Sequence, residues 1–192
     1  MNNLLLRSLA LLMFSLIPAF SLTAAEAVSD ELIRQELERA ATAPDSEVTF
    51  TLAASIEEAF DFLVNRLPEY SEDVASASLD HASSETTNQL DAGSDRIVNL
   101  KDGKMLVHRF LNVERPGSFA YLTDMSRSTA DIPIDYSIVY YELTEEGADQ
   151  TNLRVAATFK SSSSLLSLFV RRAFDSALEA DFSMAARVLA AE

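Results

Sequence analysis

The chain has 192 residues, 48% of them hydrophobic, no cysteine, and a formal net charge of -15 at pH 7. This length suits one domain, and the hydrophobic content excludes an intrinsically disordered protein. The lack of cysteine excludes disulfides, thiol catalysis and thiolate metal sites, and the negative charge argues against binding to nucleic acid or to anionic membrane surfaces.

The start of the chain, residues 1–27, predicts a secretory signal peptide. Arg7 supplies the positive charge, residues 8–22 form an apolar stretch, and small residues follow. We therefore expect cleavage near residues 25–27 and an exported protein, periplasmic or secreted, with no membrane span left. The alternative is an uncleaved anchor, because residues 8–25 carry no charge over a length that can just cross a bilayer.

A short amphipathic helix is expected over residues 30–42. Ser29 can cap its start, its apolar residues recur on one edge, and a proline soon follows it. We assign residues 28–46 to this helix and a linker. Residues 47–192 are assigned to the main domain.

A strand and a capped helix open the main domain. Residues 47–53 alternate between apolar and polar side chains, as a half-buried strand does. Ser55 and Glu58 have the spacing of a capping box, in which each side chain accepts a hydrogen bond from the other residue's backbone N–H. The helix predicted from this start ends at Pro68.

Several strands are expected in the middle of the chain. The Asp102-Gly103 pair predicts a tight turn between strands over residues 96–100 and 104–113, because these residues tolerate the positive φ angles of a two-residue hairpin. Residues 72–89 have a weak pattern that predicts edge strands. Further strands are expected over residues 118–125, 134–143 and 151–159.

A long helix is expected to end the chain, since residues 148–192 contain neither glycine nor proline. The four serines at 161–164 are expected to cap it. Its predicted apolar face consists of Leu166, Val170, Ala173, Ala177, Ala180, Met184 and Val188, widened by Phe174, Leu178 and Phe182. Because this apolar arc is broad, we expect a curved sheet to cover the helix on more than one side.

The order and the turns of these elements match those of a known family. Residues 48–60 correspond to its opening strand, small-residue corner and capped helix. The middle hairpins of the family correspond to Gly93, Gly103 and residues 113–116. The family's turn into the last strand corresponds to Gly147 followed by residues 151–155. The chain thus resembles the helix-grip fold of the START-like superfamily (SRPBCC), which includes polyketide cyclase/dehydrase and lipid-transport families.

This resemblance implies an α+β fold in which a curved antiparallel sheet wraps around the C-terminal helix. It also implies a central cavity that binds a hydrophobic or amphipathic small molecule, such as a lipid, an isoprenoid or an aromatic compound. The family includes both binding proteins and enzymes. We expect a binding protein here and keep two alternatives. One is an enzyme of the cyclase or hydratase type, and the other is a structural or interaction protein with a filled core.

Two adjacent basic residues of one predicted strand are candidates for the cavity. Side chains alternate along a strand, so one of His108 and Arg109 faces the interior. An inward Arg109 could bind a carboxylate or phosphate of the ligand, and the alternative is a half-exposed Arg109 paired with an acidic neighbour. His108 could be a general base, but it has no obvious partner and a structural role is the alternative.

The other cavity candidates are Tyr121, Tyr141, Phe174 and Asp181. The two tyrosines lie in predicted strands, where their hydroxyls can reach a pocket or only cover the sheet. Phe174 widens the apolar face of the last helix. Asp181 lies within that face, where a carboxylate is costly unless it is protonated, beside a cavity, or paired, for example with Arg109.

No cofactor, metal or catalytic residue is predicted. The two histidines are far apart and there is no cysteine, so metal-ligand spacing is lacking. Four glycines provide no phosphate-binding loop, and the sequence has no Gly-x-Ser-x-Gly nucleophile motif. The expected partner is therefore a hydrophobic small molecule, and no nucleic acid.

Overall fold

The structure is a computed structural model that describes residues 28–192. The predicted signal peptide, with its alternative as an anchor, lies outside the described residues. Within residues 28–192, no helix combines the length and the apolar character needed to cross a bilayer.

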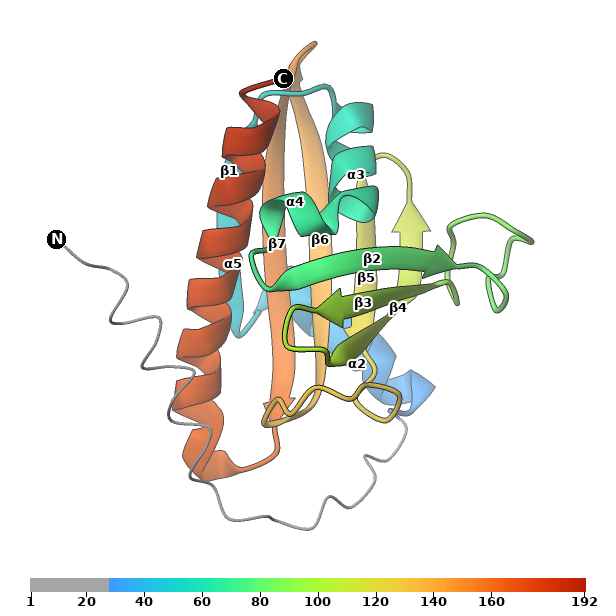
Figure 1. Ribbon diagram of the computed structural model, residues 1–192, viewed down its shortest axis with the longest axis vertical. Helices are drawn as coiled ribbons and strands as arrows, with labels where there is room; N and C mark the ends of the chain where they lie inside the picture. Colours follow the sequence, from blue (N-terminus) through green and yellow to red (C-terminus); the bar gives the residue numbers. More distant parts are fainter. Residues whose placement is uncertain (1–27) are drawn as a thin grey trace, which may run out of the picture.

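All strands belong to one antiparallel sheet, in the order β1-β7-β6-β5-β4-β3-β2 (Figure 1). The strands are β1 (Ser46–Leu52), β2 (Val74–Asp80), β3 (Asp95–Leu100), β4 (Met105–Glu114), β5 (Ser118–Thr123), β6 (Ile134–Gly147) and β7 (Gln150–Ser161). The helices are α2 (Asp30–Thr42), α3 (Ile56–Asn65), α4 (Leu67–Tyr70) and α5 (Ser167–Leu189). This architecture confirms the predicted α+β helix-grip fold.

The helices cover the sheet unequally on its two faces (Figure 1). The inner face packs against α3, α4 and α5, and the main core lies between these layers. On the outer face, a smaller cluster centred on Leu122, Tyr136 and Ile138 packs against apolar residues of α2. Edge strands were predicted over residues 72–89, and the structure has one strand there, β2, at an edge of the sheet.

The start of α3 confirms the capping box predicted from sequence. The Ser55 hydroxyl accepts a hydrogen bond from the backbone N–H of Glu58, and the Glu58 carboxylate accepts one from the backbone N–H of Ser55. Two N–H groups that a helix leaves unpaired are thereby satisfied. The cap fixes the start of the helix that carries Phe60, Leu63 and Val64 into the core.

We expect the substitution Ser55→Ala to lower the free energy of unfolding by about 1 kcal/mol, because it removes this cap. Urea denaturation followed by circular dichroism measures the change. Ser163→Ala is the matched control, since the Ser163 side chain caps no helix, and it should change stability by less than about 0.5 kcal/mol. Equal losses in the two variants would contradict the capping role.

The start of α5 differs from the sequence prediction. A short 3-10 turn (Ser164–Leu166) precedes it, and neither this turn nor α5 has a side-chain cap. The serines instead stabilise the connection from β7. The hydroxyl of Ser161 donates a hydrogen bond to the carbonyl oxygen of Ser163 at 2.8 Å and accepts one from the backbone N–H of Ser163 at 3.4 Å.

The buried face of α5 is also rotated from the predicted one. Its buried residues are Val170, Leu178, Phe182, Ala185 and Leu189. Ala173, Ala177, Ala180 and Met184 are exposed, so the described part of the chain does not cover the helix on a second side. Alanine buries little apolar area, so the sheet packs against the stripe that contains the bulkier side chains.

Candidate functional site

A row of side chains, all polar except that of Leu79, crosses the inner face of the sheet. Antiparallel pairing places Leu79, Arg96, His108, Thr123 and Ser137 opposite one another on neighbouring strands β2 to β6. All but Leu79 are buried, and the Ser137 hydroxyl donates a hydrogen bond to Thr123 at 2.9 Å. Buried polar groups in a core need partners, so this row marks a candidate site.

Arg96 is the centre of this site, with 1% of its surface exposed. Its Nη1 donates to the carbonyl oxygens of Leu63 and Val64, at 3.3 Å and 3.4 Å, in the last turn of α3. The guanidinium also lies over the rings of Tyr121 and Phe110, 4.9 Å and 5.7 Å from their centroids. The negative end of the α3 dipole and the faces of these rings both favour a cation.

Among the described residues, no carboxylate pairs with Arg96. Its Nε is buried without a hydrogen-bond partner. Arginine stays protonated in proteins, so the site holds an uncompensated positive charge. Such a charge is costly to bury and is the most unusual electrostatic feature of this core.

His108 lies beside Arg96, with 3.2 Å between its Nδ1 and Arg96 Nη2. Burial, with a further contribution from Arg96, lowers the pKa of His108 well below 6.5, so the imidazole is neutral. Since Arg96 can only donate, Nδ1 is the acceptor and the proton lies on Nε2. The ring stacks on Tyr121 with 4.2 Å between centroids. A neutral histidine with Nδ1 already bonded is poorly placed to be a general base at pH 7.

Three buried tyrosines surround the guanidinium. Burial raises the pKa values of Tyr70, Tyr121 and Tyr141 above 10, so their hydroxyls are neutral hydrogen-bonding groups. The Tyr70 hydroxyl donates to the carbonyl oxygen of Leu63 at 2.7 Å. Tyr141 contacts Phe182 of α5 edge-on at 5.6 Å between centroids. The sheet and α5 therefore meet through these rings.

Asp181 of α5 is partly buried near the loop that follows α4. Burial is the main cause that raises the pKa of its carboxyl from 3.8 to about 7, and the negative charges of Asp73 and Glu72 add to it. A hydrogen bond with Ser71 acts in the opposite direction. The carboxyl is therefore partly protonated at neutral pH.

We expect Asp181→Asn to stabilise the protein at pH 8 by about 2–4 kcal/mol and to have almost no effect near pH 3. The folded state binds the Asp181 proton more tightly than the unfolded state does, so wild-type stability falls as pH rises from about 4 to about 7. Urea denaturation at several pH values measures the difference. Glu179→Gln, at an exposed position of the same helix, is the control, and an Asn variant less stable at pH 8 would contradict the expectation.

The structure separates the residues proposed from sequence. Tyr121 and Tyr141 lie beside Arg96, and Asp181 lies near enough to affect the pKa values of Tyr70 and Tyr121. Phe174 stacks on Phe159 with 4.6 Å between centroids, at the other half of α5.

Arg109 lies on the outer face of the sheet, opposite Leu122. Its Nε is 3.7 Å from Oδ1 of Asp95, and 43% of its side chain is exposed. Arg109 is thus half-exposed and paired with an acidic neighbour, which was the alternative to a ligand-binding role. It forms no ion pair with Asp181. A β-bulge between Phe110 and Asn112 breaks the alternation in β4 and places both Phe110 and Val113 against the inner core.

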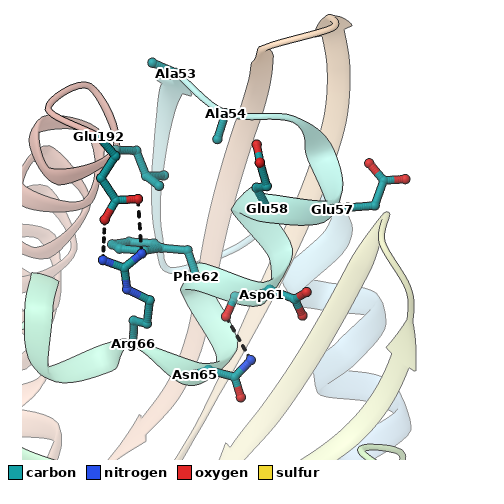
Figure 2. Close-up of a pocket in the computed structure, with 10 residues that line it drawn as sticks. Ala53, Ala54, Glu57, Glu58, Asp61, Phe62, Asn65, Arg66 and Glu192 are labelled. Carbon is teal, nitrogen blue, oxygen red and sulfur yellow. Dashed lines mark hydrogen bonds and ion pairs between the residues drawn. The ribbon is translucent and has the colours of Figure 1, made fainter.

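Two pockets lie near α3, and Asn65 lines both of them. The larger, about 690 Å³, lies between α3 and the end of α5 and is lined by Ala53, Ala54, Glu57, Glu58, Asp61, Phe62, Asn65, Arg66, Leu189 and Glu192 (Figure 2). Arg66 pairs there with Glu192 and, at 2.6 Å, with Glu69. Among the described residues, no three or more histidines and carboxylates are grouped so that they could hold a metal ion.

The smaller pocket, about 170 Å³, is lined by Val64, Asn65, Ala77, Ser78, Leu79 and Arg96. It lies between the end of α3 and strands β2 and β3 at the edge of the sheet. Neither of the two pockets is lined by both a strand and α5, where the sequence analysis places the cavity. There the rings of Tyr141 and Phe182 are in contact.

No protein-family model matches the chain, and no curated protein does. Solved structures do match. A START superfamily protein from Mycobacterium smegmatis has a TM-score of 0.59 and 11% identity, over 74% of this chain and 94% of that one. Ara h 8.0201 has a TM-score of 0.59 and 13% identity, over 76% of this chain and 97% of that one.

A third structure, DynU16, is described as a putative protein in the dynemicin biosynthetic locus. It has a TM-score of 0.53 and 16% identity, over 75% of this chain and 46% of that one. These likenesses confirm that the chain has the START-like fold predicted from sequence. At such low identity they show the fold alone.

Proposed function

We propose that the protein binds a hydrophobic or amphipathic small molecule between the inner face of the sheet and α5. The START-like fold supports this proposal, and one observation carries it. The rings that face α5 are accompanied by neutral tyrosine hydroxyls and by the charged Arg96. A purely structural core gains nothing from a buried cation without a counter-charge, whereas a binding site uses such groups to orient its ligand.

A ligand at this place must separate rings that now touch, Tyr141 on β6 and Phe182 on α5. α5 is the last helix of the described chain, and it packs against β1, β7 and α4. It can move without breaking any hydrogen bond between strands. We infer that ligand uptake is a local opening of α5, of the kind that proteins undergo far below their global unfolding energy.

We also propose that binding takes place outside the cytoplasm, after removal of a signal peptide. The pattern of residues 1–27 supports this. N-terminal sequencing of the protein from the periplasm or the culture medium should give a first residue near 26–28. Recovery of the chain with Met1 intact in the membrane fraction would support the anchor instead.

Native mass spectrometry tests the binding function directly. Protein isolated from its exported compartment is expected to carry one apolar small molecule, which organic extraction removes. The extracted protein should then bind the neutral apolar dye Nile red with a blue shift of its emission. If no additional mass is found and Nile red does not bind, the contacts that fill the core between sheet and α5 would favour a structural or interaction protein.

A further inference from the structure

The charge of Arg96 is balanced in an unusual way. A buried guanidinium normally needs an anion or a full set of acceptors, because removing it from water costs several kcal/mol. Arg96 has two carbonyl oxygens, one imidazole nitrogen, two ring faces and the hydroxyls of the surrounding tyrosines as partners. Each of these is neutral. The groups in contact with Arg96 therefore supply no negative charge that would balance its own.

The donors of Arg96 are also incompletely used. A guanidinium has five N–H donors in a fixed plane. Nη1 and Nη2 have the acceptors described above, and Nε is buried with none. An unpaired buried donor is costly in a folded protein and in many cases marks the place of a missing partner.

Arg96 also lines the smaller pocket, of about 170 Å³. Val64, Ala77 and Leu79 give this pocket apolar walls, Asn65 and Ser78 add neutral polar groups, and no carboxylate lines it. A cavity of about 150 Å³ is large enough to bind benzene. The pocket thus has room for the polar end of a ligand and a short apolar stem.

The distribution of charge around α3 points to the same ligand class. The larger pocket is lined by four carboxylates, those of Glu57, Glu58, Asp61 and Glu192, and by one cation, Arg66 (Figure 2). In the smaller pocket, Arg96 is the single charged residue of the lining. In a chain with a net charge of -15, a pocket whose charge is positive selects for an acidic ligand.

We propose that the smaller pocket receives the carboxylate of an amphipathic ligand, with Arg96 as its receptor and the apolar part of the ligand directed towards the inner aromatic face. The proposal rests on the binding function proposed above and specifies the ligand as an acid. A carboxylate supplies the negative charge that Arg96 lacks and accepts from Nε–H, and charge-assisted bonds of this kind are among the strongest in proteins. Neutral His108 adds no second positive charge, so one carboxylate is enough to balance Arg96.

A matched pair of fluorescent ligands tests the proposal, cis-parinaric acid and its methyl ester. Both have the same apolar chain, and only the acid has a carboxylate. We expect the wild-type protein to bind the acid at least tenfold more tightly than the ester. In Arg96→Gln the preference should fall to less than about twofold with the ester affinity unchanged, and Arg96→Lys should retain an intermediate preference.

Arg66→Gln is the matched control, because it removes an arginine that lines the larger, acidic pocket and not the smaller one, and it should keep the wild-type preference. A second measurement needs no variant: the acid, and not the ester, should shift the NMR resonance of the Arg96 Nε–H in the wild-type protein. Equal binding of acid and ester, or an unchanged preference in a folded Arg96→Gln, would overturn the acidic ligand and leave the binding function standing. Binding of neither probe would overturn both proposals.

Discussion

Replacing Phe182 by alanine is expected to lower the free energy of unfolding by about 3–5 kcal/mol, the usual cost of deleting a large buried aromatic side chain. Only 2% of Phe182 is exposed. Its ring lies 5.9 Å from that of Tyr70 and 5.6 Å from that of Tyr141, between centroids. One side chain of α5 thereby contacts both α4 and the sheet. Urea denaturation of both proteins measures the loss.

Met184→Ala is the control for this prediction. Met184 lies two residues further along α5 and is 37% exposed, so its truncation should cost less than about 0.5 kcal/mol. Similar losses in the two variants would mean that α5 does not dock through the face that carries Phe182. The comparison therefore tests the rotated buried face of α5 as well as the size of the effect.

The same variant also bears on ligand binding. If the ligand occupies the space between α5 and the sheet, it competes with the Phe182 ring for contact with Tyr141. Removal of the ring leaves an apolar space, and dry cavities of that kind bind small apolar molecules. We therefore expect Phe182→Ala to bind Nile red more tightly than the wild type, despite its lower stability. A binding site and a core can share side chains, and proteins commonly give up some stability for function.

Local sequence patterns were sufficient to predict most of the architecture. The alternation in β1, the capping box of α3 and the Asp102-Gly103 turn each depend on neighbouring residues only. Such local rules agree with one another along this chain, which is why the resemblance to the START-like fold could be recognised. The face of α5 that is buried depends on the sheet, so the helix pattern alone found Val170, Leu178 and Phe182 but centred the face on alanines that are exposed.

The centre of the candidate site was missed for a physical reason. Arg96 is the second residue of β3, and arginine at the end of a strand usually reaches water. One signal was present in the sequence: Arg96 has the same parity as Val98 and Leu100, which side-chain alternation places on one face of the strand. Its helix-end acceptors in α3, its histidine neighbour and the bulge that orients β4 come from segments far apart in the chain. Only the assembled sheet brings them together.

Gly93→Ala is expected to lower the free energy of unfolding by about 3 kcal/mol or more, because strain and a steric clash add. Gly93 has a φ of +85°, which alanine adopts only at a cost. A Cβ at this position would lie 2.2 Å from the carbonyl oxygen of Ser83, and a backbone atom cannot move aside as a flexible side chain can. Thermal or urea unfolding measures the loss.

Gly103→Ala separates the two causes. Gly103 has almost the same backbone angle, φ +84°, but a Cβ there meets no atom within 4 Å. Its substitution should therefore cost only the strain, about 1–2 kcal/mol. Equal losses in the two variants would contradict the clash at Gly93.

The position of Gly93 also connects this prediction to the proposed ligand. The N–H of Gly93 donates to the carbonyl oxygen of Phe110 at 2.9 Å, and the N–H of Phe110 donates to the carbonyl oxygen of Ser94 at 2.8 Å. Ser94 lies two residues before Arg96. A displaced Gly93 would pull the start of β3 away from β4, where Arg96 meets His108. We therefore expect Gly93→Ala to weaken the preference for cis-parinaric acid over its ester, whereas Gly103→Ala, at the opposite end of β3, should leave that preference intact.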